Sequence, residues 1–316
     1  MFALRGIAIS FSVFFMVYCA LSVAVSVSWR RVYRRVRHYR VHCVADLLFA
    51  IRIFPFVSAA MITAAFTVPS FLLLEPRTIK EPLGGAPLAL GICGALLGGV
   101  GIARAMVALL RASRNVSGWT VQAEAGTPMA KVPVLRIRPS IPAMTAAGIL
   151  RPRVLVSGSA ESLLSGAELQ TTLRHEIAHV RRRDNLKKLL LCVMAFPGMR
   201  ALESEWLEAT EMAADDAAVS NAGEALDLAA ALIKLSRLGS NEAVSDLTAA
   251  LVQTSASIMN ARVERLIRWT DERREAPRQL SIGYGLGAAV IIVTFFAFTY
   301  LQLLSELHTA TEWLMR

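Results

Sequence analysis

Five consecutive residues, His175-Glu-Ile-Ala-His179, have the types and the spacing needed to bind a metal ion. Two histidines four positions apart lie on one face of a helix, so both imidazoles can bind the same ion. Glu176, beside the first of them, can reach a water molecule on that ion and act as a base. The alternative is a pair of helical histidines on a charged face without any metal. The pattern favours a metal site with Glu176 as the catalytic base, because the helix that such a site requires is also predicted here.

A catalytic zinc ion needs a third protein ligand and an open position for water. The other histidines lie outside the central part of the chain, so this ligand should be a carboxylate. The next predicted helix carries Glu208, Glu211 and Asp215. Glu211 and Asp215 share a helix face, so one can bind zinc while the other accepts a hydrogen bond from the far nitrogen of a ligating histidine. We favour Glu211 as the ligand and Asp215 as the hydrogen-bond partner, with Glu208 as the competing ligand. The alternative for all three is a solvated acidic helix face.

The helix that carries the histidines is predicted to begin at a capping box, in which Ser165 is followed three residues later by Glu168. It should run to about Arg183, where basic residues complement the negative end of the helix dipole. Before it, β-branched and alternating residues predict strands over 120–124, 132–138 and 153–157. We expect one of the last two to be an edge strand that pairs with an extended substrate. After it, periodicity predicts a short apolar helix at 189–196 and helices over 200–221, 224–238, 244–254 and 257–270.

The apolar composition sets this chain apart from soluble enzymes. Of its 316 residues, 55% are hydrophobic and 18% are charged, whereas ordinary soluble domains have about 45–50% and about 25%. The excess lies in four apolar runs that are long enough to cross a bilayer: residues 6–28, 53–74, 88–110 and 283–304. The third run contains a Gly94-x-x-x-Gly98 pair, which is typical of close packing against another helix, although a glycine-rich span can also contain this spacing by chance. This distribution excludes a soluble enzyme, a disordered protein and a secreted disulfide scaffold.

The four runs divide the chain into three parts. Residues 1–111 should form three transmembrane helices with a basic cytosolic loop at 29–46, and residues 282–316 a fourth helix with a short outer tail. Residues 112–281 should form a domain inserted between spans three and four. The six arginines of the basic loop place it inside, so both termini lie outside the plasma membrane and the domain is cytosolic. The net charge of +10 is concentrated beside the apolar runs, which favours contact with membrane lipid over nucleic acid.

Three stretches together resemble a known family: Gly148-Ile-Leu-Arg-Pro-Arg-Val-Leu-Val156, Ser165-Gly-Ala-Glu-Leu169 and His175-Glu-Ile-Ala-His-Val-Arg-Arg-Arg-Asp184. They are similar to integral-membrane zinc metallopeptidases of the β-lactam-sensor type, the signal transducers of penicillin and methicillin resistance. The Glu211-x-x-x-Asp215 pair resembles both this family and the wider group of gluzincin proteases. The antibiotic sensors carry a penicillin-binding domain after the last span. Only about a dozen residues follow that span here, so we do not expect this chain to sense β-lactams directly.

The resemblance implies both a fold and a site. The fold is an α-helical membrane protein with four transmembrane helices and an α+β, mostly helical gluzincin domain between spans three and four. The site holds one catalytic Zn²⁺ on His175, His179 and Glu211. The resemblance further implies Glu176 as the general base and Asp215 as the residue that orients a ligand.

Together these features predict an integral-membrane zinc endopeptidase that cleaves a cytosolic regulator or a membrane protein at the inner membrane face, in signal-regulated proteolysis. The alternatives are a quality-control protease for membrane proteins and a non-cleaving receptor with a zinc-binding domain. The expected partners are a protein or peptide substrate, membrane lipid and a separate sensor or regulator protein. The central domain has no tyrosine, so the donor that stabilises the oxyanion should be an arginine, Asn221 or a group of the basic loop (Tyr33, His38, Tyr39).

Overall fold

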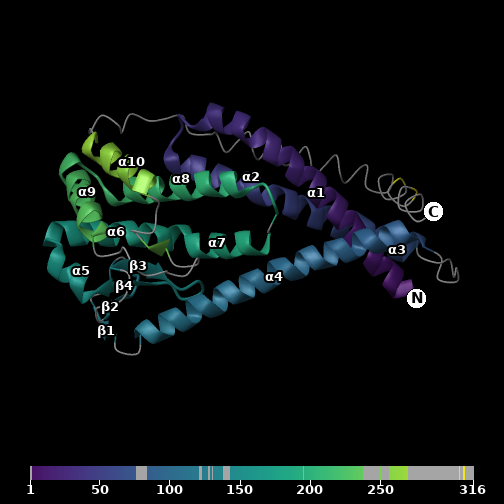
Figure 1. The fold of residues 1–316 in the computed structure, drawn as a ribbon, viewed down its shortest axis with the longest axis horizontal. Coiled ribbons are helices and arrows are strands. Elements are labelled where there is room, and N and C mark those ends of the chain that lie inside the picture. The colour runs from purple at the N-terminus through teal and green to yellow at the C-terminus, as the bar shows by residue number, and fades with distance from the viewer. Residues whose placement is uncertain are drawn as a thin grey trace.

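A computed structural model describes residues 2–75, 84–120, 123–126, 129, 131–137, 143–194, 196–237, 249–250, 256–269, 306 and 309. Long apolar helices form one end of the molecule, and a mixed domain of shorter helices and a small sheet forms the other (Figure 1). The mostly helical fold with a small sheet agrees with the predicted fold class. The predicted fourth span at 283–304 lies outside the described residues, as does most of the predicted helix 244–254.

Three helical stretches in the N-terminal part are long and apolar enough to cross a membrane. They contain the first three predicted apolar runs. Helix α1 packs against both of the others. The stretches are α1 (Phe2–Val36), then α2 (Val41–Ile62) continued by a π-helical turn (Thr63–Thr67) and α3 (Val68–Leu74), and finally α4 (Gly85–Thr120).

Glycines on α4 allow this close packing, and they include Gly94 of the predicted pair but not Gly98. A Cβ atom at Gly94 would lie 2.5 Å from the carbonyl oxygen of Phe11 on α1, and one at Gly91 would lie 2.8 Å from that of Ala8. At Gly98, in contrast, no described atom lies within 4 Å of such a Cβ. The face that approaches α1 is therefore formed by Gly91 and Gly94, which are three residues apart.

The basic segment predicted as a loop at 29–46 is mostly helical. Helix α1 continues through the first arginines to Val36, and α2 begins at Val41, so only residues 37–40 make the turn. The fall in hydropathy at residue 29 marks a change in composition and not the end of the helix, and the segment can still connect the first two apolar runs. Arginine has a high helix propensity and its long side chain is readily solvated, so the helix can continue past that point.

The mixed domain is built on a five-stranded sheet with the order β1-β2-β4-β3-β5. Strands β2 and β4 are parallel, and the other neighbours are antiparallel. The predicted strands 132–138 and 153–157 correspond to β2 and β4. Both lie inside the sheet, so the expectation that one of them is an edge strand was wrong. The strands are β1 (Glu124–Ala125), β2 (Val134–Ile137), β3 (Met144–Ala147), β4 (Arg153–Ser157) and β5 (Ala249–Ala250).

Two further elements differ from the prediction. Residues 120–124 were expected to be a strand, but α4 extends to Thr120 and β1 begins at Glu124. The last turns of α4 are helical because Val116 and Trp119 cover one face of the sheet, where they pack on a cluster that includes Leu155. Strand β5 pairs with β3 at residues that were predicted as part of the helix 244–254.

Six helices complete the described part of the domain. Those over 200–221, 224–238 and 257–270 were predicted to within about four residues of the observed bounds. The capping box is present: Ser165 Oγ accepts from the backbone N–H of Glu168 at 3.3 Å, and Glu168 Oε2 accepts from the N–H of Ser165 at 2.8 Å. The helices are α5 (Gly158–Leu163), α6 (Gly166–Arg182), α7 (Asp184–Val193), α8 (Arg200–Ala218), α9 (Ala222–Ser236) and α10 (Ala256–Ile267).

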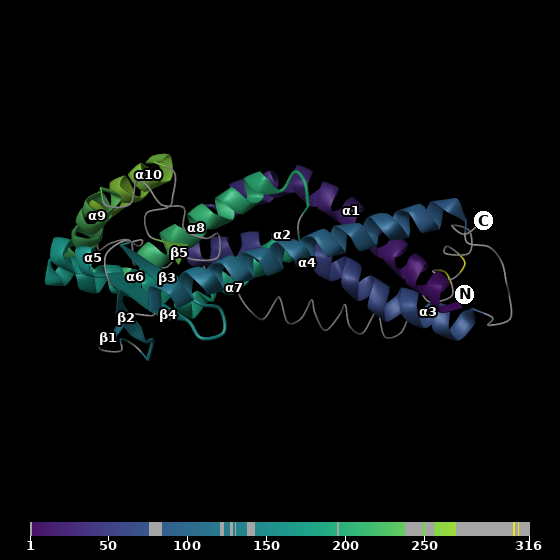
Figure 2. The same cartoon turned by 60° about the horizontal axis from the view of Figure 1, so that its bottom comes forward.

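Two hydrophobic clusters fix the position of α6 and α8. In the first, α6 packs on the face of the sheet opposite α4, α9 packs on α6, and α10 packs on α9, with Val154, Ile177 and Leu232 among the buried residues. In the second, one face of α8 packs against α1 and α2, with Trp206 and Leu48 among the buried residues. Helix α8 also packs against α6. Figure 2 shows α8 running between the mixed domain and the apolar helices.

Candidate metal centre

Helices α6 and α8 bring three metal-binding side chains to one point. His175 and His179 lie one turn apart on α6, and their Nε2 atoms are 3.1 Å apart. Glu211 comes from α8, and its carboxylate oxygens lie 3.6 Å from each of the two Nε2 atoms. Within the part of the chain that the structure describes, these three residues form the group that could hold a metal ion, with one ligand atom from each within 4.8 Å of the others.

Acidic side chains contact the outer nitrogens of both imidazoles. His175 Nδ1 lies 2.9 Å from Asp215 Oδ1, and His179 Nδ1 makes a 2.8 Å hydrogen bond to Asp184 Oδ2. Because the Nδ1 side of each ring faces a carboxylate, the Nε2 atoms face the common point beside Glu211. Burial alone would lower the pKa of His175, but contacts with Asp215 and Glu211 outweigh it and raise that pKa to about 9.

Arg262 of α10, which was not assigned a role from the sequence, completes the group of charges. Its side chain is fully buried, and it forms ion pairs with both Asp215 and Glu211. Burial alone would raise the pKa of Glu211, but His179 and Arg262 outweigh it and hold that pKa at about 2. The pKa of Asp215 is lowered well below its usual value, since Arg262 outweighs the effect of burial. Both acids are therefore carboxylates.

Glu176 is a buried acid of the site whose carboxylate no other side chain binds. It is 0% exposed, neither of its oxygens forms a hydrogen bond to a side chain among the described residues, and the backbone of Ala146 on β3 is close enough to lower its pKa. Burial raises its pKa above the ordinary value, although His175 and His179 oppose this effect. Keeping a buried carboxyl group without a side-chain partner costs free energy, so its presence here indicates a group that acts on something the site receives.

The residues present fit a zinc ion. Zinc takes imidazole nitrogen at about 2.0–2.1 Å and carboxylate oxygen at similar distances, which in a tetrahedron separates neighbouring ligand atoms by about 3.3 Å. The observed separations of 3.1 Å between the imidazoles and 3.6 Å to Glu211 are close to this value. Three protein ligands would leave the fourth position open, as in catalytic sites.

The other candidates from the sequence lie elsewhere. Glu208 is outside the metal-binding group, beside Glu205, and burial together with the charge of Glu205 raises its pKa. Asn221 caps α9, where its Oδ1 accepts from the backbone N–H of Glu224 at 2.9 Å. Tyr33 and Tyr39 pack on the cluster between α1, α2 and α8. The arginine that the structure brings to the acids of the site is Arg262.

A sequence signal for Arg262 exists, although it is visible only in retrospect. Met259, Arg262, Val263 and Leu266 follow the spacing of an apolar helix face, and Met259 and Leu266 are buried. An arginine within such a face is buried with its charge and must have an acidic partner. The sequence signal for Asp184 is weaker: it is an acid directly after the predicted end of the histidine helix, where its side chain could point in many directions.

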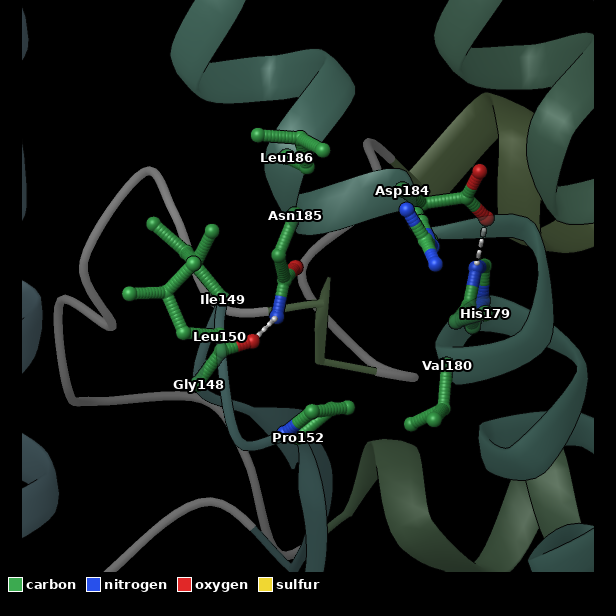
Figure 3. A pocket seen from close by; sticks show the side chains of 10 residues that line it. Gly148, Ile149, Leu150, Pro152, His179, Val180, Asp184, Asn185 and Leu186 are labelled. Atoms are coloured by element: carbon green, nitrogen blue, oxygen red, sulfur yellow. Dashed lines mark hydrogen bonds and ion pairs between the residues drawn. The ribbon is translucent and has the colours of Figure 1, made fainter.

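A cavity of about 320 Å³ lies behind His179, on the side of Asp184 (Figure 3). The turn between β3 and β4 and the start of α7 form its walls, and Asn185 Nδ2 bridges them by donating to the carbonyl oxygen of Gly148 at 3.3 Å. Its lining residues are Gly148, Ile149, Leu150, Pro152, His179, Val180, Arg183, Asp184, Asn185 and Leu186.

Comparison with known proteins agrees with this geometry. No curated protein matches the chain. Residues 88–266 match the family described as BlaR1 peptidase M56. The match covers more than half of the chain and includes the elements that carry both histidines, both acids of α8 and Arg262. With apolar helices long enough to cross a membrane and a buried His-His-Glu group, the chain belongs to the BlaR1 peptidase M56 family of membrane-associated peptidases.

Proposed function

We propose that this protein is an integral-membrane zinc endopeptidase that hydrolyses peptide bonds of a cytosolic regulator or a membrane protein at the cytoplasmic face of the membrane, in signal-regulated proteolysis. One observation carries the proposal. Three metal-binding atoms lie within 4.8 Å of one another beside a buried glutamate whose oxygens form no hydrogen bond to a side chain among the described residues. A site that only bound metal would have no need of this glutamate.

His175, His179 and Glu211 would hold the ion, with Asp215 orienting His175. When bound, zinc supplies a Lewis acid that polarises the scissile carbonyl and makes a water molecule more acidic. Glu176 takes a proton from the water molecule while the water oxygen attacks the carbonyl carbon. It then gives that proton to the amide nitrogen as the C–N bond breaks. The raised pKa of Glu176 suits both steps, because a base with a pKa nearer the working pH is also the better acid.

The position of the site supports a substrate close to the membrane. Helix α8 carries Glu211 and Asp215 and packs along one face on α1 and α2. The arginines at the end of α1 support a cytoplasmic location for this side, through the positive-inside rule. A substrate would then be a protein segment that reaches the inner membrane surface.

Glu176→Gln tests the proposed chemistry. The amide keeps the shape of the side chain but cannot take the proton, so we expect stoichiometric zinc and a cleavage rate at least about 100-fold lower than that of the wild-type protein. The measurements are zinc content and cleavage of labelled, unfolded casein by the purified full chain in detergent. Glu161→Gln, which changes an acid paired with Arg136 at the surface, is the matched control and should cleave normally. Wild-type turnover by Glu176→Gln would refute the role of Glu176, and a wild-type protein that holds no zinc would refute the proposed function.

A further inference from the structure

Arg262 binds both acids that α8 contributes to the site. Its Nε donates to Asp215 Oδ2 at 2.8 Å, its Nη2 donates to Asp215 Oδ1 at 2.7 Å, and its Nη1 lies 3.0 Å from Glu211 Oε2. The two bonds to Asp215 form the parallel pair that a planar guanidinium makes with a carboxylate. All three guanidinium nitrogens therefore contact the pair Glu211 and Asp215.

This arrangement is not needed to attach α10 to the domain. Arg265, one turn further along α10, pairs with Asp216 of α8 nearer the surface. Met259 and Leu266 pack α10 into the core on either side of Arg262. Burial of a guanidinium is costly, and an apolar side chain of similar volume would pack here at lower cost. An arginine at this position therefore indicates a requirement of the site.

That requirement follows from the geometry of Asp215. Its Oδ1 accepts from Arg262 and also lies 2.9 Å from His175 Nδ1. Because both carboxylate oxygens are bound by the guanidinium, the carboxylate cannot rotate, and the imidazole ring that it contacts is fixed with Nε2 toward Glu211. The cation also offsets the repulsion among Glu176, Glu211 and Asp215, which lie close together in a water-poor interior.

We propose that Arg262 is a positioning residue for the metal centre: it holds the Glu211 and Asp215 carboxylates so that His175 and Glu211 present their donor atoms to one ion. This inference rests on the proposed zinc site. It adds a residue from a third helix to a constellation that the sequence motifs place on two helices. Arg262 acts through Asp215 and Glu211 and needs no contact with substrate.

The test compares Arg262→Gln and Arg262→Lys with Arg265→Gln in the purified full chain. Zinc affinity is measured by competition with a chromophoric chelator, and folding by thermal melting with and without zinc. We expect Arg262→Gln to weaken zinc binding by about 10–100-fold, as is usual when a group that orients a ligand is lost. The zinc affinity of Arg262→Lys should lie between those of Arg262→Gln and the wild-type protein, because an ammonium group keeps the charge but cannot make the paired bonds to Asp215. Arg265→Gln removes an arginine from the same helix and should bind zinc as the wild-type protein does.

A double mutant separates positioning from simple packing. If Arg262 acts through Asp215, adding Arg262→Gln to an Asp215→Asn variant should weaken zinc binding by less than it does in the wild-type background. Wild-type zinc affinity in folded Arg262→Gln would overturn the inference. Should that variant fail to fold, Arg262→Lys decides, and wild-type affinity there would overturn it equally. None of these assays needs cleavage, so the inference can fail while zinc still binds, whereas absence of zinc from the wild-type protein would be a failure of the proposed function.

Discussion

At the scale of single residues, the metal centre depends on acids that contact the outer nitrogens of its histidines. Asp215 reaches His175 from α8, and Asp184 reaches His179 from the start of α7. The second contact needs a sharp change of direction, which Arg183 provides by taking a left-handed conformation with φ 54° between α6 and α7. Asp184 thereby turns back to a histidine only five residues earlier, which a continuous helix would not allow.

Asp184→Asn should weaken zinc binding by about 10–100-fold. The amide keeps the shape of the side chain but removes its negative charge. That charge strengthens the hydrogen bond to His179 Nδ1 and thereby makes His179 Nε2 a better metal ligand. Chelator competition on the purified full chain measures the effect. Asp216→Asn, which removes an acid paired with Arg265 away from the histidines, is the control and should retain wild-type affinity. Equal affinities for Asp184→Asn and the wild-type protein would show that the orientation of His179 does not depend on Asp184.

At the scale of secondary structure, the start of α6 is fixed by more than its capping box. Glu168 binds the N–H of Ser165 and also accepts from Lys234 Nζ of α9 at 2.7 and 2.8 Å. Burial alone would raise the pKa of Glu168, but Lys234 and Ser165 outweigh it and lower that pKa below 4.5. An ion pair thus joins the first turn of α6, the helix that carries both histidines, to α9.

Lys234→Met should lower the stability of the domain by about 1 kcal/mol near neutral pH, since the ammonium group is partly solvated and its ion pair is screened. Because the pKa of Glu168 is lower in the folded than in the unfolded protein, its ion pair stabilises the fold at pH values above the unfolded-state pKa. This contribution is lost as the pH falls through the folded-state pKa. The difference in stability between the variant and the wild-type protein should therefore shrink as the pH falls into the acidic range in which Glu168 is protonated. Thermal melting in detergent over this pH range tests it, with Arg268→Gln, which breaks an exposed pair with Glu264, as the control. A difference that is the same at low and neutral pH would contradict the assignment to Glu168.

The elements that the sequence predicts are those with a strong local signal. Helix α6 has a capping box and a regular polar and apolar period, and its bounds agree with the prediction to within one residue. Strand β3 was missed because Met144-Thr-Ala-Ala147 has little β propensity, and it forms a strand because β4 and β5 pair with it on both sides. Spacing on two helices predicted His175 and His179 and favoured Glu211 over Glu208. The position of Arg262 could not be predicted, since it depends on how α10 packs on α9 and so reaches the acids of α8.

At the scale of the whole molecule, α7 and α8 connect the metal centre to the apolar helices. Helix α7 begins at Asp184, beside His179, and its last turn packs on α4 (Figure 2). The carbonyl oxygen of Met194, directly after α7, accepts from Tyr18 of α1 at 2.9 Å and from Arg52 of α2 at 2.6 Å. Arg52 also pairs with Glu203 near the start of α8. The geometry of the site therefore depends on how the apolar helices pack.

Gly101→Ala tests this dependence at the closest approach. A Cβ atom at Gly101 would overlap the carbonyl oxygen of Val193 at the end of α7, so α4 and α7 must separate. We expect a loss of stability of about 1–3 kcal/mol from this overpacking, measured as a lower melting temperature in detergent. Zinc affinity should fall as well, because α7 carries Asp184 at its other end. Gly98→Ala is the matched control: it adds the same methyl group and the same gain in helix propensity to the same helix, where no described atom of another element lies within 4 Å, and it should lower neither the melting temperature nor the zinc affinity. A Gly101→Ala protein that is destabilised but binds zinc normally would show that α7 tolerates displacement at one end without moving His179 at the other.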